Sequence, residues 1–492
     1  MSKKPSQPDI LFIFTDQWNP RMLGCYGDEK VRTPIIDALA AEGMRFDAAY
    51  TQSPVCMPAR VSLASSQYPH NHGLWSNMTG FRFPSERITI HRDLWNAGYF
   101  TAKVGKFHYE DPHTPHDDIA AWYRSLGLDY ARELPTPYST PWHVTPYSEH
   151  LKSKGLLRGY LDDLCERFEL GDATVIAPAP IPPEDHPDSN VARHALEAID
   201  ACPEDKPLNL CVSFPGPHSP FDAPGEYSTM FDPKDMVLPP NVPETTRQGE
   251  HSYDRDHIRR AQANYYGKIK LLDDRIGTII AKIKERGNWN NTLVIFTADH
   301  GENLGAHGRF FKGTFNDESV RVPLILRWPG HIPEGTATDA LAQLIDINPT
   351  LVDAAGGKQS PHKFGRSLMP VATRCEERIH DCVFSEIGNA GHRNYMVRDP
   401  QYKWYRHRRE EHLYDMRNDP NELSNLIHDP KYGDDASRLR ARLGKFLMES
   451  QINVADTYVS LFGRINNQLK PGETIGSMLR KQFEEIHFGE DL

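Results

Sequence analysis

The sequence has no long uninterrupted apolar run. Its first apolar stretch, Ile10–Phe14, is too short for a signal peptide and is soon followed by Asp16. No stretch elsewhere is long and apolar enough to span a bilayer. The seven cysteines are an odd number without paired spacing, which excludes a disulfide framework or a zinc ribbon. We therefore predict a cytoplasmic protein with reduced thiols.

Long runs of like charge are also missing, although the formal net charge is −11. The 67 acidic and 56 basic residues are spread along the chain. This distribution argues against nucleic acid or an anionic membrane surface as a partner. A chain of 492 residues is too long for one ordinary core and predicts one large domain plus a smaller one.

Two apolar, β-rich stretches end in polar residues, as strands buried in a parallel sheet do. The stretches are 9–15 and 292–297. Ligands bind where the carboxyl ends of such strands meet, and two carboxylates there would repel each other without a cation. We therefore predict one divalent metal ion, held by Asp16, Gln17, Asp299 and His300. Oxygen ligands favour Ca²⁺ or Mg²⁺, and the imidazole leaves Mn²⁺ or Zn²⁺ open. The alternative is that both segments are ordinary strand-end turns.

A cysteine, Cys56, lies at the predicted start of a helix. Pro58 follows it, and proline is favoured in the first turn of a helix. The N–H groups at the amino end of a helix favour an anion. Arg60 comes one turn later, on the same face as Cys56. These features predict a site for an anionic substrate, whereas the alternative is that Cys56 is a small buried hydrophobe.

The order Cys56-x-Pro58-x-Arg60 resembles the motif that directs oxidation of cysteine to formylglycine in type I sulfatases, within the alkaline phosphatase superfamily. The segments 299–324 and 413–426 also resemble parts of sulfatases. The resemblance implies an α/β fold of alkaline phosphatase type, with an α/β/α sandwich around a large mixed, mostly parallel sheet. It also implies a smaller C-terminal α+β domain with an antiparallel sheet. A formylglycine-generating enzyme would then be a partner during maturation.

The periodicity changes near residue 375. We predict a catalytic domain over 1–375, with a specificity insertion at about 110–187, and a C-terminal α+β subdomain with a tail over 376–492. Short β-rich runs without intervening helices predict the antiparallel sheet, at 383–387, 395–398 and 403–407. The tail carries scattered apolar groups that could contact a partner subunit, so a homo-oligomer formed through the tail is one possibility.

Helices and further strands are predicted from apolar periodicity and cap signals. The helices are 33–43, which Thr33 would cap, and 149–169, 188–200, 259–286 and 436–449; the strands are 99–104 and 208–214. Four histidines in or beside the insertion have spacings that fit no ordered metal site, so we interpret them as solvated loop residues. They are His113, His116, His143 and His186.

The resemblance assigns roles to residues beyond the cysteine motif. Lys106 and His108 lie in a Gly-Lys-x-His segment, His218 lies in a Pro-His-x-Pro turn, and Lys312 matches the second anion-binding lysine of the family. Asn77 and His307 are candidates for substrate contacts. Their structural alternatives are a surface asparagine and a glycine-flanked turn.

The implied reaction is hydrolysis of a sulfate ester to an alcohol and inorganic sulfate. The hydrated aldehyde of formylglycine at position 56, itself also a metal ligand, would attack sulfur. His218 or Lys312 would protonate the alcohol, and His108 would then act as the base that releases sulfate. The cations Arg60, Lys106 and Lys312 would balance charge on the sulfate oxygens.

Two other functions stay open. The first is hydrolysis of phosphonate monoesters or phosphodiesters, because Gln17 stands where many sulfatases carry aspartate and resembles phosphonate monoester hydrolases and choline sulfatases. Lys106 and His108 argue against phosphonate hydrolysis, because those phosphonate hydrolases use neutral hydroxyl side chains in that region. The second is a non-catalytic protein that binds sulfated ligands, with Cys56 unmodified.

Overall fold

The computed structural model describes residues 7–451 apart from 79, 85–86, 88, 112–118, 135, 137–143, 171, 173, 362 and 390–391. Contacts divide the chain into two compact units, Met1–Phe446 and Leu447–Leu492. The fold below is that of the first unit. None of the helices in the described part of the chain is both long and apolar enough to cross a membrane.

An eight-stranded sheet lies at the centre of this unit, in the order β12-β2-β11-β9-β1-β6-β4-β5. Its strands are β1 (Asp9–Asp16), β2 (Met44–Phe46), β4 (Phe100–Gly105), β5 (Tyr130–Glu133), β6 (Leu208–Pro217), β9 (Thr292–Ala298), β11 (Leu324–Arg327) and β12 (Thr336–Thr338). The strands from β9 to β5 run parallel, and β11 is antiparallel to both of its neighbours. All residues of β1, β6 and β9 are buried, as expected for strands covered on both faces.

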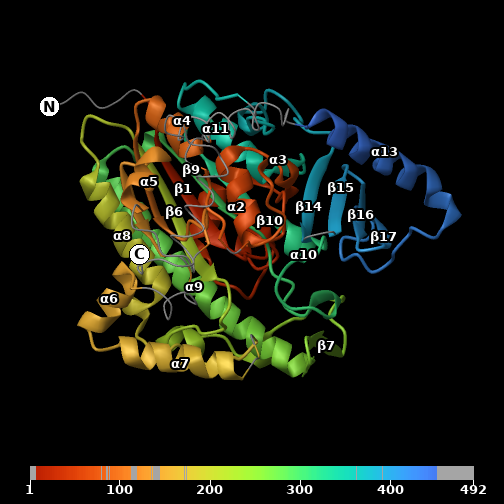
Figure 1. Ribbon diagram of the computed structural model, residues 1–492, viewed down its shortest axis with the longest axis horizontal. Coiled ribbons are helices and arrows are strands. Elements are labelled where there is room, and N and C mark those ends of the chain that lie inside the picture. The colour runs from red at the N-terminus through yellow and green to blue at the C-terminus, as the bar shows by residue number, and fades with distance from the viewer. Residues whose placement is uncertain are drawn as a thin grey trace, which may run out of the picture. The chain divides into compact units, whose positions relative to one another are not determined.

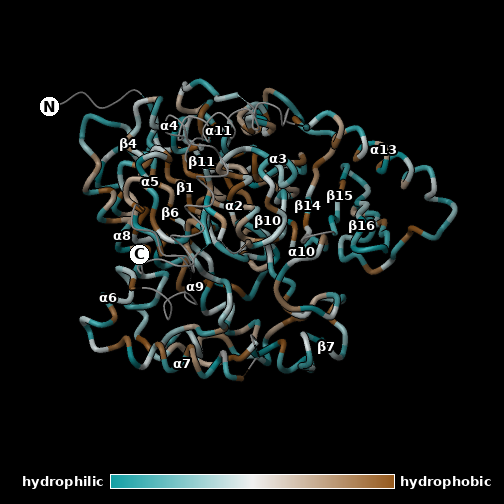
Figure 2. Tube along the Cα trace, viewed as in Figure 1, coloured by the Kyte–Doolittle hydropathy of each residue, from teal (hydrophilic) through white to brown (hydrophobic). Residues whose placement is uncertain are grey.

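Two groups of helices flank the sheet (Figure 1). One group consists of α1 (Pro34–Ala41), α8 (Pro187–Ala201) and α9 (Arg255–Arg286), which contact one another. The other consists of α2 (Cys56–Ser65), α4 (Ile90–Asn96) and α11 (Ile347–Ala354). In Figure 2 the hydrophobic segments concentrate along β1 and β6, between these two groups. The predicted sandwich with a mixed, mostly parallel sheet is confirmed.

A separate four-stranded antiparallel sheet follows in the chain, and it too confirms the prediction. It contains β14 (Val383–Asn389), β15 (His392–Arg398), β16 (Tyr402–His407) and β17 (Glu410–Asp415). Its apolar face packs on Tyr50 and Phe315. Lys403 on β16 also forms buried ion pairs with Asp317 and Glu422. These contacts hold the small sheet against the segment that follows β9.

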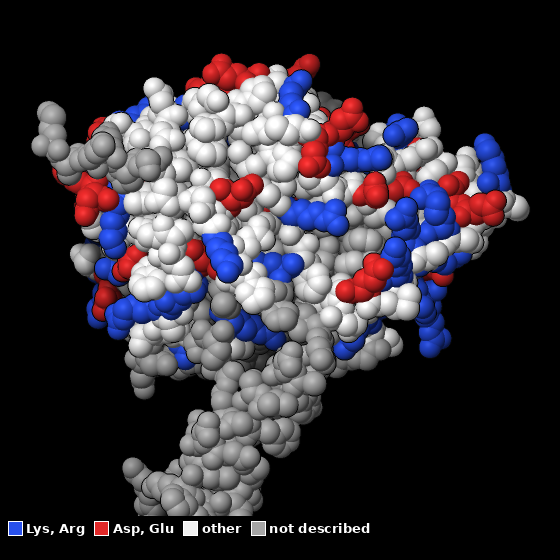
Figure 3. Space-filling model, turned by 90° about the horizontal axis from the view of Figure 1, so that it is seen from above, with Lys and Arg blue, Asp and Glu red and all other residues white. Residues whose placement is uncertain are grey.

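The remaining elements are short or lie on the periphery. The strands are β3 (Ala49–Tyr50), β10 (Arg321–Val322) and β13 (Ala342–Gln343), which form a three-stranded sheet, and the hairpin of β7 (Thr245–Gln248) and β8 (His251–Asp254). The helices are α3 (Pro69–His72), α5 (Ile119–Ser125), α6 (Pro146–Ser153), α7 (Leu157–Glu169), α10 (Asp317–Val320), α12 (Met369–Ala372) and α13 (Gly433–Glu449). On the face shown in Figure 3, acidic and basic side chains are interspersed over the described surface.

Three local predictions were wrong. The helix predicted at 149–169 is two helices, because Gly155 adopts a positive φ of 73° between α6 and α7. Thr33 precedes α1 but its side chain does not cap it. Instead, Asp273 of α9 accepts hydrogen bonds from the backbone N–H groups of Ile35 and Ile36.

The third error concerns His186, which is not a solvated loop residue. It is only 2% exposed, and its Nδ1 lies 3.3 Å from a carboxylate oxygen of Asp188. Its side chain accepts a hydrogen bond from the backbone N–H of Asp188 at the start of α8. The other three histidines of that group, His113, His116 and His143, lie outside the described residues.

Candidate active site

The carboxyl ends of β1 and β9 bring two aspartates together. The strands pair in parallel register, with Thr15 opposite Ala298. The next residues, Asp16 and Asp299, therefore leave the same edge of the sheet side by side. The backbone N–H of Asp299 also donates to the carbonyl oxygen of Thr15 at 3.1 Å, which extends the parallel register to the ends of both strands. Both aspartates are fully buried.

The amino end of α2 adds Cys56 to these carboxylates. The cysteine is 1% exposed, and its Sγ lies 3.1 Å from Nε2 of His300 and 3.7 Å from Oδ1 of Asp16. Ligand atoms of Asp16, Cys56, Asp299 and His300 all lie within 4.8 Å of one another. Three parts of the chain, the end of β1, the start of α2 and the residues after β9, thus converge at the edge of the sheet.

The chemistry of these side chains fits a divalent metal ion. Nδ1 of His300 lies 2.9 Å from the carbonyl oxygen of Gly301, so this nitrogen carries the proton and donates. The lone pair of Nε2 then faces the two carboxylates, as a metal-binding imidazole requires. Gln17 stands beside the group, with its backbone N–H donating to Oδ1 of Asp299 at 3.0 Å. Its side-chain amide contacts Glu302 and Lys312.

Two buried cations neutralise part of the negative charge. Arg60 donates through Nε to Asp299 at 2.7 Å and through Nη2 to Asp16 at 3.2 Å. Lys106 donates to the same oxygen of Asp16 that Arg60 contacts. Burial opposes ionisation of Asp16, but the charges of Lys106 and Arg60 hold its pKa below the ordinary value. Arg60 itself is fully buried and pairs with both carboxylates.

A lysine and a histidine lie on the other side of the cysteine. Nζ of Lys312 is 2.5 Å from Oε1 of Gln17 and 2.6 Å from Nε2 of His218. Nδ1 of His218 donates to the carbonyl oxygen of Ser219 at 2.7 Å, so its Nε2 accepts from the lysine. Burial and the charge of Lys312 together lower the pKa of His218, which keeps this imidazole neutral.

The electrostatic surroundings of Cys56 favour an anion. Burial would raise the pKa of the thiol, yet the charges of Lys106 and Lys312 hold it well below the ordinary value. His108 contributes a hydrogen bond to the thiolate. Burial lowers the pKa of His108 to about 4, so this imidazole is neutral at neutral pH.

Asn77 and His307 do not join this cluster of side chains. Asn77 is exposed, and its Oδ1 accepts a hydrogen bond from the backbone N–H of Met57 at 3.0 Å. It therefore acts on the first turn of α2. His307 lies 3.5 Å from Glu318 and 3.0 Å from Asn241. It belongs to a cleft beside the site.

The sequence did not indicate two residues that support the cluster. Glu302, fully buried, accepts from the side chain of Gln17 and from the backbone N–H groups of Leu304 and Phe311. Ser213, within β6, accepts from Nη1 of Arg60 at 2.8 Å. Glu302 follows directly after Asp299-His300-Gly301, and this position is the feature by which the sequence could have indicated it. Nothing local distinguishes Ser213 from other strand residues.

Comparison with known families agrees with this arrangement. A family model described as Sulfatase matches residues 8–357, and one described as N-sulphoglucosamine sulphohydrolase, C-terminal, matches residues 305–449. The first match covers the central sheet and every residue of the cluster. The second begins in the segment after β9 and includes the whole antiparallel sheet.

Individual proteins with similar sequences have sulfatase names. An arylsulfatase of Clostridium perfringens is 29% identical over 90% of this chain and 94% of its own length. An uncharacterised sulfatase of Escherichia coli is 30% identical over 92% of this chain and 89% of its own length. Among solved structures, a phosphonate monoester hydrolase from Silicibacter pomeroyi superposes with a TM-score of 0.76 at 25% identity, over 91% of this chain and 96% of that one.

Proposed function

The chain belongs to the sulfatase family, within the alkaline phosphatase superfamily, and is a sulfuric ester hydrolase; we propose that it hydrolyses sulfate monoesters after conversion of Cys56 to formylglycine. The observation that carries this proposal is the convergence of two carboxylates and an imidazole on Cys56, with Lys106 paired to Asp16 and Lys312 bonded to Gln17 beside them. A formylglycine-generating enzyme would supply the modification, with the helix-start motif as its recognition sequence.

The metal ion would be held by Asp16, Gln17, Asp299, His300 and residue 56. The four buried ligands within 4.8 Å and the orientation of His300 support such a site. A bound divalent cation, with Ca²⁺ as the candidate we favour, would make an oxygen nucleophile more acidic and balance the charge of the sulfate group. Gln17 is neutral, so it would leave the bound cation with more uncompensated positive charge than an aspartate there.

Residues of the chain would share the proton transfers. Nζ of Lys312 lies between Gln17 and the neutral His218, and we assign to Lys312 the protonation of the departing alcohol. His108 has a pKa of about 4 because of burial, and its neutral imidazole is suited to act as the base that releases sulfate. Lys106, which contacts Asp16, supplies a positive charge close to the sulfate oxygens.

Arg60 has a different task in this proposal. Its guanidinium binds Asp299, Asp16 and Ser213 at once. We therefore propose that Arg60 orients the two carboxylates for the metal ion and does not itself contact the substrate.

The test is a comparison of cysteine variants in a host that contains the maturing enzyme. We expect a peptide mass spectrum to show formylglycine at position 56 and an unmodified thiol at Cys211. Cys56→Ala should lower kcat/KM for 4-nitrophenyl sulfate by about a thousandfold or more, as loss of a nucleophile does. Cys211→Ala is the matched control, because Cys211 is equally buried but lies within β6. Active enzyme with only a thiol at position 56 would refute the proposal.

Hydrolysis of phosphonate monoesters is a second candidate for the same site. It is favoured by Gln17 and by the likeness to solved phosphonate monoester hydrolases. Lys106 and His108 favour sulfate, because Lys106 pairs with Asp16 of the cluster and both side chains would contact the transferred group. We expect kcat/KM to be higher for an aryl sulfate than for the matching phenylphosphonate ester. A tenfold ratio corresponds to about 1.4 kcal/mol. A tenfold preference for the phosphonate, unchanged in Lys106→Ala, would favour the second candidate.

A further inference from the structure

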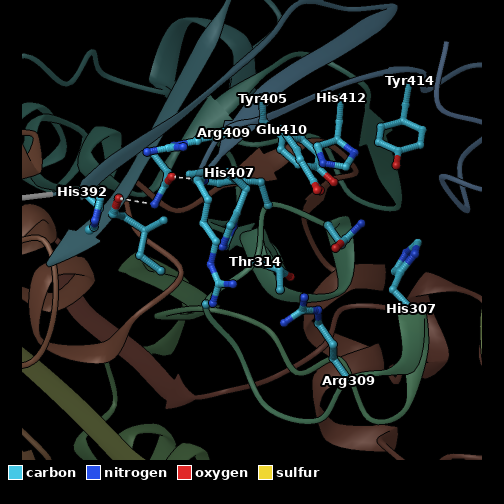
Figure 4. A pocket seen from close by; sticks show the side chains of 17 residues that line it. His307, Arg309, Thr314, His392, Tyr405, His407, Arg409, Glu410, His412 and Tyr414 are labelled. Carbon is cyan, nitrogen blue, oxygen red and sulfur yellow. Dashed lines mark hydrogen bonds between the residues drawn. The ribbon is translucent and has the colours of Figure 1, made fainter. Parts of the chain in front are cut away.

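A cleft of about 800 Å³ lies between the segment after β9 and the antiparallel sheet. Residues 307–316 form one wall, and strands β14–β17 form the other. In Figure 4 the side chains of His307 and Arg309 project from the first wall toward the strands that carry Tyr405, His412 and Tyr414. This volume is in the usual range for sites that bind small molecules.

The cleft is rich in positive charge. Its lining includes three arginines, Arg309, Arg408 and Arg409, and four histidines, whereas Glu410 is the one acidic residue among the lining residues. All three arginines are exposed. None of their guanidinium groups forms an ion pair or side-chain hydrogen bond with another residue in the part of the chain that the structure describes. The cations are therefore available to a ligand.

The two walls bring these cations together from distant parts of the chain. Arg408 and Arg409 form the tight turn between β16 and β17, where His407 pairs with Glu410. Burial lowers the pKa of His407, and the charges of Arg309 and Arg408 lower it further. Such crowding of like charges is unfavourable in an empty cleft and is relieved when an anion binds.

The cleft adjoins the reaction centre beside Lys312. Gly313, one of its lining residues, follows Lys312 directly and donates its backbone N–H to the carbonyl of Pro54 at 3.1 Å. Pro54 lies two residues before Cys56. A substrate whose alcohol oxygen is protonated by Lys312 would thus extend its alcohol portion into the cleft.

Neutral groups in the cleft match a saccharide. Thr314, Asn316 and Asn394 are polar residues of the lining, each at most 7% exposed. The ring of His412 stacks on the buried Tyr405 at 4.5 Å, and an aromatic ring suits the apolar face of a sugar ring. The lining therefore combines an aromatic ring, polar side chains and uncompensated guanidinium groups.

We propose that this cleft binds a second anionic group, a carboxylate or another sulfate, on a saccharide whose sulfate ester is cleaved at residue 56. This inference rests on the proposed function, and it assigns the substrate class to acidic sulfated saccharides. Arg309 on one wall and Arg408 with Arg409 on the other bind the second anion. The bidentate geometry of guanidinium suits both carboxylate and sulfate.

The test uses binding, so that it does not depend on turnover. The probe is a disaccharide of a 2-N,6-O-disulfated glucosamine and a uronic acid, titrated by calorimetry into Cys56→Ala protein. We expect Arg408→Gln/Arg409→Gln in that background to raise Kd at least tenfold, which corresponds to about 1.4 kcal/mol, and to reduce the salt dependence of binding. Arg309→Gln tests the opposite wall independently. Arg158→Gln is the control, because Arg158 is an exposed arginine on α7, and we expect no change in its Kd.

Two further probes identify the anion, namely the carboxyl-reduced disaccharide and the disaccharide with the 6-O-sulfate alone. If one of these probes binds more weakly than the full disaccharide, and the arginine substitutions no longer raise its Kd, the group removed from that probe is the second anion. Equal Kd values for the arginine variants and the Arg158→Gln control, with melting temperatures unchanged, would overturn the inference, as would no binding of the probe. Failure of the proposed function shows separately, as absence of 4-nitrophenyl sulfate hydrolysis by the matured wild-type enzyme.

Discussion

At the scale of single residues, the site depends on how buried charges are balanced. Asp16 and Asp299 leave adjacent strands with no solvent around them. Arg60 makes four side-chain hydrogen bonds, to both aspartates, to Ser213 and to the backbone carbonyl of Lys106. A guanidinium can satisfy acceptors in several directions at once, whereas an ammonium group on a flexible stem cannot hold that arrangement.

We predict that Arg60→Met destabilises the protein by about 3–5 kcal/mol, because it leaves two buried carboxylates without their shared cation. Arg60→Lys should be more stable than Arg60→Met but equally inactive, because lysine keeps the positive charge and lacks the planar guanidinium that binds several acceptors at once. Urea unfolding followed by circular dichroism measures the first effect, and kcat/KM for an aryl sulfate measures the second. Arg158→Met is the control for removing an exposed arginine. A loss below about 1 kcal/mol for Arg60→Met, the range of surface pairs, would contradict this account.

At the scale of secondary-structure elements, the helices are held by contacts that are distant in sequence. The amino end of α1 has no side-chain cap of its own. Asp273, in the middle of α9, accepts from Ile35 and Ile36 at 3.1 and 3.0 Å. This contact joins α1 to α9 on the face of the sheet that α8 also covers. A carboxylate at a helix amino end also interacts favourably with the helix dipole.

We predict that Asp273→Ala lowers the free energy of unfolding by about 1 kcal/mol, as the loss of a cap does. Burial raises the pKa of Asp273 from 3.8 to about 7. The native state therefore binds this proton more tightly than the unfolded state, and the contribution of Asp273 to stability falls as pH rises from about 4 to about 7. Asp273→Asn keeps an acceptor and cannot ionise, so its stability relative to the wild type should increase over that range. A pH-independent difference between the two proteins in chemical denaturation would count against this assignment.

At the scale of the whole molecule, the proposed metal site joins parts of the chain that are far apart. Its ligands come from β1, the start of α2 and the end of β9, which span residues 16 to 300. A ligand that binds only the native state stabilises it by mass action, by about 2.7 kcal/mol at a concentration a hundred times its Kd. Metal binding should therefore stabilise the large unit as a whole.

We predict that saturating Ca²⁺ raises the melting temperature and that a chelator reverses the shift. Asp299→Ala should abolish the stoichiometric cation, the thermal shift and the hydrolytic activity together. Asp381→Ala, which changes an exposed aspartate, should leave all three unchanged. Mass spectrometry measures the bound cation and calorimetry measures the melting temperature, in the wild type and in both variants. An undiminished stoichiometric cation in Asp299→Ala would show that the metal site lies elsewhere.

Local patterns in the sequence determined the elements that deliver the site. The apolar runs before Asp16 and Asp299 could only be buried strands, and Pro58 defined the helix start at Cys56. These features arise from neighbouring residues, whose burial and backbone preferences can be evaluated without knowledge of the fold. The same locality explains the errors at Thr33 and Gly155, where a distant aspartate and a single glycine dihedral decided the outcome.

Only the tertiary structure decided which charges meet. Arg60 lies one turn from Cys56 in sequence, and the fold brings its guanidinium to Asp16 and Asp299, whose strands are distant in the chain. The basic cleft unites Arg309 with Arg408, which lie on different walls and share no sequence pattern. The physical reason is that electrostatic interactions act through space, between side chains whose separation depends on how elements distant in the sequence are packed.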